Sequence, residues 1–183
     1  MRWDDLFADL EAAADAEDRL EYEAEVAEQA RAEYAAVHLA DRLRAQHDRD
    51  LVCLLVDGAR LEGRVRDVGA QWLLLETRQG EVIVPLAALA GVEGMTRVTA
   101  APAGQVDRRA GLGVVLRRLS VEGVPVRVTL LGGTEVSGTV DRVGADHVEF
   151  AVHPLDVPRR PATVTAIRMV PTSALLRVTL GRG

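Results

Sequence analysis

Apolar and polar residues alternate over several short stretches that begin near residue 51, a pattern typical of half-buried β-strands. Asp57-Gly58 separates the first two stretches and is a strong signal for a tight hairpin turn. Gly63 lies inside the second stretch and indicates a bend in that strand. Strands in this order build a small, strongly bent barrel. The pattern predicts strands over 51–56, 60–68, 71–76, 82–84 and 90–93, with a short helical turn over 85–89.

The segment before these strands has a helical pattern. Residues 3–46 contain neither proline nor glycine, and apolar residues recur at helical spacing, as in Leu6, Leu10 and Ala13. An unbroken helix of this span would be roughly 65 Å long, which exceeds the width of a small domain. Two interpretations fit this segment: an acidic coiled-coil or docking arm, or a solvated helix whose last turns pack on the rest of the chain.

The strand pattern occurs twice along the chain. Residues 58–75 align without gaps to residues 133–150, and six of the 18 positions are identical, including three glycines. Further along, residues 82–89 resemble residues 168–175, so the second copy carries 11 additional residues between its third and fourth strands. Such self-similarity predicts that the two stretches adopt the same fold.

These residues resemble the Sm-like fold, which includes the bacterial Hfq-like proteins, over about 130 residues of the chain. The helical pattern and the resemblance together predict an α+β chain: a long N-terminal helix followed by two tandem, five-stranded Sm-like barrels, each preceded by a helix. The implied domains are an acidic arm over 1–50, a barrel over 51–98, a linker over 99–107, and a helix with the second barrel over 108–183. The matching segments are Val56-Asp57-Gly58, Leu61–Val65, Trp72–Leu75 and Val82–Val92 in the first copy, and Leu131–Val140, Val148–Val152 and Met169–Val178 in the second.

Composition narrows the class of protein. All 22 basic residues are arginine, and a GC-rich genome explains this bias without selection for phosphate binding. One cysteine excludes a disulfide framework and a cysteine-rich zinc module. No window approaches the roughly 18 apolar residues of a membrane helix, and the acidic start lacks the pattern of a secretory signal. We therefore expect a cytoplasmic protein that does not contact a membrane.

The two copies differ on the faces that point away from the predicted barrel interiors. In the first copy these positions are apolar: Val52, Leu54, Trp72 and Leu74. In the second copy the same positions hold Arg127, Thr129, His147 and Glu149. A large exposed apolar patch is unusual on a monomer, so we expect the helix, the second copy or another subunit to cover Trp72. A platform for stacking nucleic-acid bases is the alternative role of this side chain.

The candidate chemistry does not predict an enzyme. Cys53 lies inside an apolar strand, which is typical of an inert buried thiol. His147, Glu149 and His153 share one strand face, but the two histidines are six residues apart, roughly 20 Å along a strand, too far to share a metal ion. We find no nucleophile motif and no phosphate-binding glycine loop in a matching context. The sequence therefore predicts a non-enzymatic protein without a cofactor or a metal.

Charge suggests two kinds of partner. Residues 1–50 carry a net charge of −9, whereas residues 101–183 carry +4. One hypothesis is an Sm-like regulator that binds nucleic acid, with RNA favoured, through arginines around the second barrel. The alternative is a protein-interaction adaptor that uses the acidic helix and the apolar face of the first copy. Exposed sheet edges also favour a homo-oligomer. The arginines are Arg108, Arg109, Arg117, Arg118, Arg127, Arg159 and Arg160.

Overall fold

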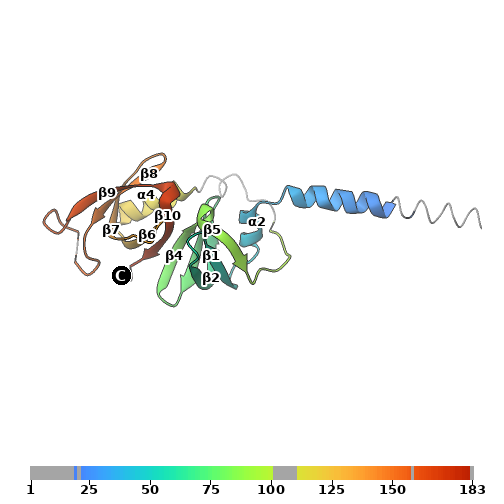
Figure 1. The fold of residues 1–183 in the computed structure, drawn as a ribbon, viewed down its shortest axis with the longest axis horizontal. Coiled ribbons are helices and arrows are strands. Elements are labelled where there is room, and N and C mark those ends of the chain that lie inside the picture. Colours follow the sequence, from blue (N-terminus) through green and yellow to red (C-terminus); the bar gives the residue numbers. More distant parts are fainter. Residues whose placement is uncertain (1–18, 20–21, 101–110, 158, 182–183) are drawn as a thin grey trace, which may run out of the picture. The chain divides into compact units, whose positions relative to one another are not determined.

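The computed structural model describes residues 19, 22–100, 111–157 and 159–181 (Figure 1). The chain divides into two compact units, residues 1–38 and residues 39–183. In the first unit the described residues 22–35 form a helix. Its side chains are largely exposed, with Tyr22 at 68% and Tyr34 at 63%.

The predicted helix over 3–46 is wrong, because the chain leaves the helical conformation at residues 36–38. There the amides of Ala36 and Val37 donate to carbonyls only three residues back, the tighter pattern that often ends an α-helix. The β-branched Val37 adds little intrinsic preference for continuing it. No coiled coil forms among the described residues, since the helix presents its side chains to solvent rather than to another helix.

Ten antiparallel strands form one open sheet in the second unit, in the order β5-β1-β2-β3-β4-β10-β6-β7-β8-β9 (Figure 1). Helices α2 (Leu39–Arg44) and α4 (Leu112–Glu122) precede β1 and β6, and the 3-10 turns η1 (Leu86–Ala88) and η2 (Thr172–Ala174) precede β5 and β10. The strands are β1 (Asp50–Leu55), β2 (Arg60–Val68), β3 (Trp72–Thr77), β4 (Gly80–Pro85), β5 (Leu89–Glu93), β6 (Pro125–Leu130), β7 (Glu135–Val143), β8 (His147–Val152), β9 (Ala166–Pro171) and β10 (Leu175–Leu180).

The prediction of two closed Sm-like barrels is wrong, and with it the family resemblance. Strand β4 does not close on its own half of the sheet but pairs with β10, where Ile83 lies opposite Val178 and Val82 opposite Thr179. A unit of five strands that does not close into a barrel leaves unpaired backbone N–H and C=O groups along its two outer strands. Pairing β4 with β10 gives hydrogen-bond partners to the backbone groups of these two strands. The result is a mostly β, single open sheet whose two remaining edges are β5 and β9.

The two halves of this sheet nevertheless have the same strand order. Strands β1 to β3 correspond to β6 to β8 with an offset of 75 residues, and β4 and β5 correspond to β9 and β10 with an offset of 86. The β-bulges coincide as well, at Val65/Asp67 in one half and Val140/Arg142 in the other. Each strand position in one half therefore has a defined equivalent in the other.

Side chains cross the β4–β10 junction in both directions. Trp72 and Ile83 from the first half belong to the core of the second half, where they join Leu116 of α4. In return, Leu176 of β10 belongs to the core of the first half and is 1% exposed. Trp72 is 7% exposed, and of the three covers expected for it the second copy is the one observed. The exchange makes the two halves one packing unit.

The bend in β7 requires a glycine. Gly138 has φ +155°, and a Cβ added there would lie 2.0 Å from the carbonyl oxygen of Ala151 on β8. At the equivalent position on β2, a Cβ on Gly63 would lie 2.8 Å from the carbonyl oxygen of Glu76. The repeated glycine therefore lets neighbouring strands approach at the point where each strand curves.

Candidate binding groove and sheet edges

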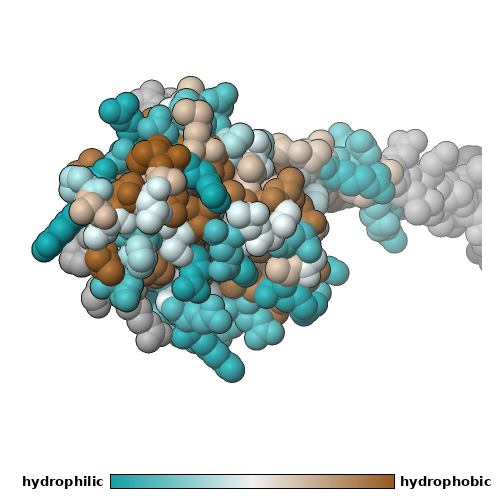
Figure 2. Space-filling model, turned by 60° about the vertical axis from the view of Figure 1, so that its left-hand side comes forward, coloured by the Kyte–Doolittle hydropathy of each residue, from teal (hydrophilic) through white to brown (hydrophobic). Residues whose placement is uncertain are grey.

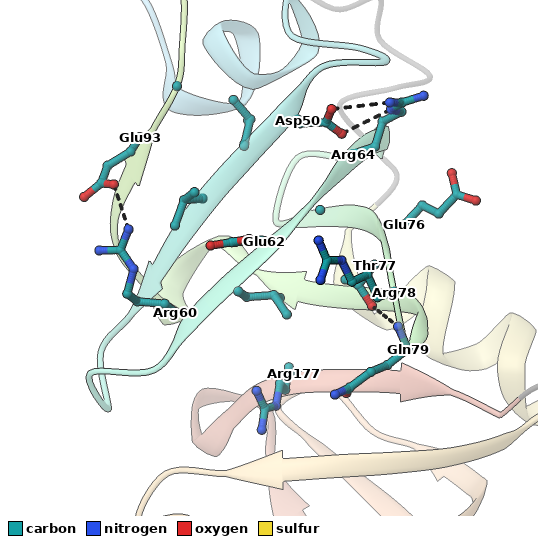
Figure 3. A pocket seen from close by; sticks show the side chains of 15 residues that line it. Asp50, Arg60, Glu62, Arg64, Glu76, Thr77, Arg78, Gln79, Glu93 and Arg177 are labelled. Carbon is teal, nitrogen blue, oxygen red and sulfur yellow. Dashed lines mark hydrogen bonds and ion pairs between the residues drawn. The ribbon is translucent and has the colours of Figure 1, made fainter.

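A cavity of about 650 Å³ opens along the first half of the sheet and is lined mainly by charged side chains (Figure 3). Its acidic and basic groups form pairs around the rim. Arg60 Nη2 lies 3.0 Å from Glu93 Oε2, and Arg64 Nε lies 3.2 Å from Asp50 Oδ1. The hydrogen bond to Asp50 also raises the pKa of the Arg64 guanidinium above its usual value. These groups largely neutralise one another.

A second cavity of about 360 Å³ lies next to the first, since Leu61, Gln79 and Arg177 line both. The Arg177 side chain extends toward the first cavity from β10, a strand of the other half (Figure 3). Arg127 lines the second cavity with Arg177, and Glu135 is the one acidic residue among its described lining residues. The second cavity is therefore more positive than the first.

Thr129 holds Arg177 in place. The hydroxyl oxygen of Thr129 accepts a hydrogen bond of 3.0 Å from Arg177 Nε, and the hydroxyl donates to Glu135 Oε1 at 3.4 Å. Thr129 points to the face that the sequence predicts as outward, yet it is only 5% exposed. Sequence reasoning missed Arg177 and Glu135, although Arg177 occupies the position of Gly91 in the first half, a substitution visible at the 86-residue offset.

The seven arginines predicted to bind nucleic acid lie on several different segments of the chain. Arg108 and Arg109 lie outside the described residues. Arg117 and Arg118 are exposed on α4, and Arg118 Nε lies 2.8 Å from Glu122 Oε1. Arg127 lies on β6 at the second cavity.

The remaining two predicted arginines lie in the segment between β8 and β9. Arg159 forms an ion pair with Asp141 on β7 and lines a third cavity of about 380 Å³. Arg160 is exposed, and its main chain forms a turn with Thr163. Arg159 and Arg160 thus lie on a different segment from Arg127, and Arg159 is already ion-paired.

The four residues of the predicted apolar face have separate environments. Trp72 is in the core of the second half, and Leu74 packs against that core. Val52 and Leu54 lie on β1 and are partly buried, and Val52 lines the first cavity. Trp72 therefore serves packing, and its burial removes it from any surface that a base or a partner protein could reach.

The other reactive groups are held in structural roles. Burial raises the pKa of the Cys53 thiol from 9.0 to about 11. His153 is 3% exposed, unlike the solvated position predicted for it, and its ring forms hydrogen bonds with the Pro154 carbonyl and the Thr139 hydroxyl. His147 Nδ1 lies 2.9 Å from Asp146 Oδ1 and lowers the pKa of that carboxyl. No cluster of three metal-ligating side chains occurs among the described residues.

The two edges of the sheet differ in character. On β9, Ile167 is 55% exposed and Met169 62% exposed, with Arg168 between them. The half of the sheet that contains β9 comes forward in Figure 2, where apolar side chains reach the surface among hydrophilic ones. On β5, Glu93 is exposed and Val92 is partly buried. Each edge thus offers one charged side chain, and the two charges are opposite.

Comparison of the chain with protein-family models, with curated proteins and with solved structures found no match. Across the described part of the chain, each helix is too short or too polar to cross a membrane.

Proposed function

We propose that this protein is a non-enzymatic assembly protein whose copies join head to tail, with β9 of one copy pairing with β5 of the next. The observation that carries the proposal is the internal β4–β10 junction. Strand β9 is the equivalent of β4, and β5 is the equivalent of β10. The two bare edges of the chain are thus the same kind of strands as the two that already pair inside it.

The internal junction specifies a register for the pairing between copies. Inside the chain, Ile83 lies opposite Val178, and Val82 lies opposite Thr179. An offset of 86 residues converts the first pair to Met169 opposite Val92. It converts the second pair to Arg168 opposite Glu93.

The residues brought together in this register are chemically complementary. Arg168 and Glu93 carry opposite charges, and oppositely charged cross-strand neighbours stabilise a sheet by about 0.2–1 kcal/mol. Met169 would bury a side chain that is 62% exposed in one copy, at the place where the equivalent Ile83 is 2% exposed. Arg168 has no ion pair among the described residues, whereas Glu93 already pairs with Arg60 at 3.0 Å, so the contact between copies would place Glu93 between Arg60 and Arg168.

The contact between copies should be weaker than the internal one. The equivalents of Trp72 and Leu74, which pack into the second half, are His147 and Glu149. The equivalent of Leu176 is Ala90, which offers a smaller side chain to the facing core. We therefore expect an association that depends on protein concentration and weakens as salt screens the Arg168–Glu93 pair. Because the two surfaces differ, the contact is heterologous and can extend from copy to copy.

Charge reversal tests the proposal. In analytical ultracentrifugation of the full chain, the mass should exceed the 19.7 kDa of one chain and rise with concentration. Arg168→Glu places two acids opposite each other, and Glu93→Arg places two arginines opposite each other, so each variant alone should be monomeric. An equimolar mixture of the two variants should assemble again, because every contact in it joins an acid to an arginine.

Two controls change the net charge equally without touching the predicted contact. Glu62→Arg on β2 and Arg142→Glu on β7 should assemble like the unmodified chain. A monomer at all concentrations would contradict the proposal. Assembly that Arg168→Glu abolishes but Glu93→Arg leaves intact would indicate a contact between two β9 edges and would also contradict it.

A further inference from the structure

We infer that Arg127 and Arg177 form a binding site for the phosphate groups of a single-stranded nucleic acid. The two side chains lie on one face of neighbouring strands, since Arg127 is opposite Thr179 and Arg177 is opposite Thr129. Residues in this diagonal relation are about 7–8 Å apart at Cα, close enough for two arginines to reach one oxyanion or two successive ones. Both side chains line the second cavity.

The hydrogen-bonding capacity of these arginines is largely unused. Arg127 has no hydrogen bond or ion pair to another described side chain, and the described contact of Arg177 is from Nε to Thr129. The terminal nitrogens of Arg177 are therefore free to donate to a ligand, while Nε fixes the orientation of the fork. A guanidinium held in this way matches the geometry of phosphate oxygens.

The other arginines along the groove differ in this respect. Arg60 and Arg64 are bound to Glu93 and Asp50, so a ligand would have to displace an internal partner. At the positions of Arg177 and Thr129, the first half has Gly91 and Leu54, which cannot bind an anion. Only the second copy therefore carries the arginine pair. The first copy adopts the same strand order without it.

The shape of the groove favours an extended ligand. The second cavity lies next to the first, since Leu61, Gln79 and Arg177 line both, and the two together span the junction between the halves. The described lining residues include no aromatic side chain on which a base could stack. Contacts would therefore be made to the backbone phosphates, which position a strand without reading its sequence.

Fluorescence anisotropy with a labelled oligouridylate tests the site. The unmodified chain should bind with an affinity that falls as salt rises. The double variant Arg127→Ala/Arg177→Ala should bind at least tenfold more weakly, and its plot of log affinity against log salt should be flatter by about 1.4, the value for two lost single-strand phosphate contacts. The double variant Arg31→Ala/Arg142→Ala is the matched control: it also removes two exposed arginines, neither of which lines the groove, and it should bind like the unmodified chain.

Competition separates the phosphate sources. Unlabelled oligouridylate should displace the probe at far lower concentration than inorganic pyrophosphate or polyglutamate. Unchanged binding in the double variant, or no binding by the unmodified chain, would overturn the inference. Stronger competition by polyglutamate would indicate an acidic peptide ligand, and binding of pyrophosphate without the oligonucleotide would indicate a small anion; either result would overturn it. Binding should persist in the monomeric Arg168→Glu variant, so this test is independent of assembly.

Discussion

Arg177 on β10 donates a hydrogen bond of 3.0 Å to the Thr129 hydroxyl on β6, at positions where the first half of the sheet has glycine and leucine. In the first half a Cβ on Gly91 would lie 3.5 Å from Leu54 Cδ1, an ordinary apolar contact. The same pair of strands thus holds a polar link in one copy and apolar packing in the other. The two copies therefore share the same strand arrangement but differ in the side-chain chemistry of this face.

Removing the hydroxyl of Thr129 should destabilise the fold. Thr129→Val keeps the shape of the side chain but removes the acceptor for Arg177 and the donor to Glu135, and we expect the free energy of unfolding to fall by about 1–2 kcal/mol. Urea denaturation followed by circular dichroism measures this change. Thr179→Val is the control on the same face, since no hydrogen bond of its hydroxyl is described, and it should change stability little. Equal losses in both variants would contradict the structural role of Thr129.

Residues that cross the β4–β10 junction should couple the stability of the two halves. Trp72→Ala removes the largest of these side chains, and we expect a loss of about 3–5 kcal/mol, with about 2–5 kcal/mol for Leu176→Ala. Both variants should still unfold in one transition, because each side chain lies in the core of the opposite half. Calorimetry measures the number of transitions. Two separate transitions in the unmodified chain would show that the halves unfold independently.

The close approach of β7 and β8 makes Gly138 sensitive to substitution. Gly138→Ala places a Cβ 2.0 Å from a backbone oxygen that cannot move without shifting β8, and the residue must keep a positive φ. We expect a loss of more than about 3 kcal/mol or a failure to fold. Gly58→Ala is the comparison, because Gly58 also has positive φ but has open space around it. Its cost should be near 1 kcal/mol. Similar thermal stability of the two variants would contradict this argument.

The sequence predicts most of the strands but not how these strands pair into one sheet. Alternation and turn residues place the five strands of the first copy within two residues of their observed bounds, and repeated glycines mark the bends. What the pattern leaves open is which edge a strand selects, since β4 could pair within its own half or with β10. That choice depends on long-range packing, such as the burial of Trp72 in the opposite core.

The same distinction between local sequence pattern and long-range strand pairing applies to the candidate site. Arg127 is identified by comparing the outward positions of the first three strands of each copy. Arg177 requires the comparison of the last strands at a different offset, and its link to Thr129 depends on the strand pairing. The helix break near Val37 is equally hidden, because neither glycine nor proline marks it.

The Cys53 thiol should resist modification in the folded protein. Cys53 is fully buried on β1, and burial raises its pKa to about 11. At pH 8 the folded thiol is therefore protonated and inaccessible, and iodoacetamide should label it only as fast as the protein unfolds.

Because the folded pKa of Cys53 lies above the unfolded value of about 9, the unfolded state loses its proton first as pH rises. The free energy of unfolding should fall by about 2–3 kcal/mol between pH 9 and pH 11 from this group. Cys53→Ala lacks the group and should lose less stability over that interval. Rapid labelling of the native protein, or identical pH dependence in the variant, would contradict the assignment.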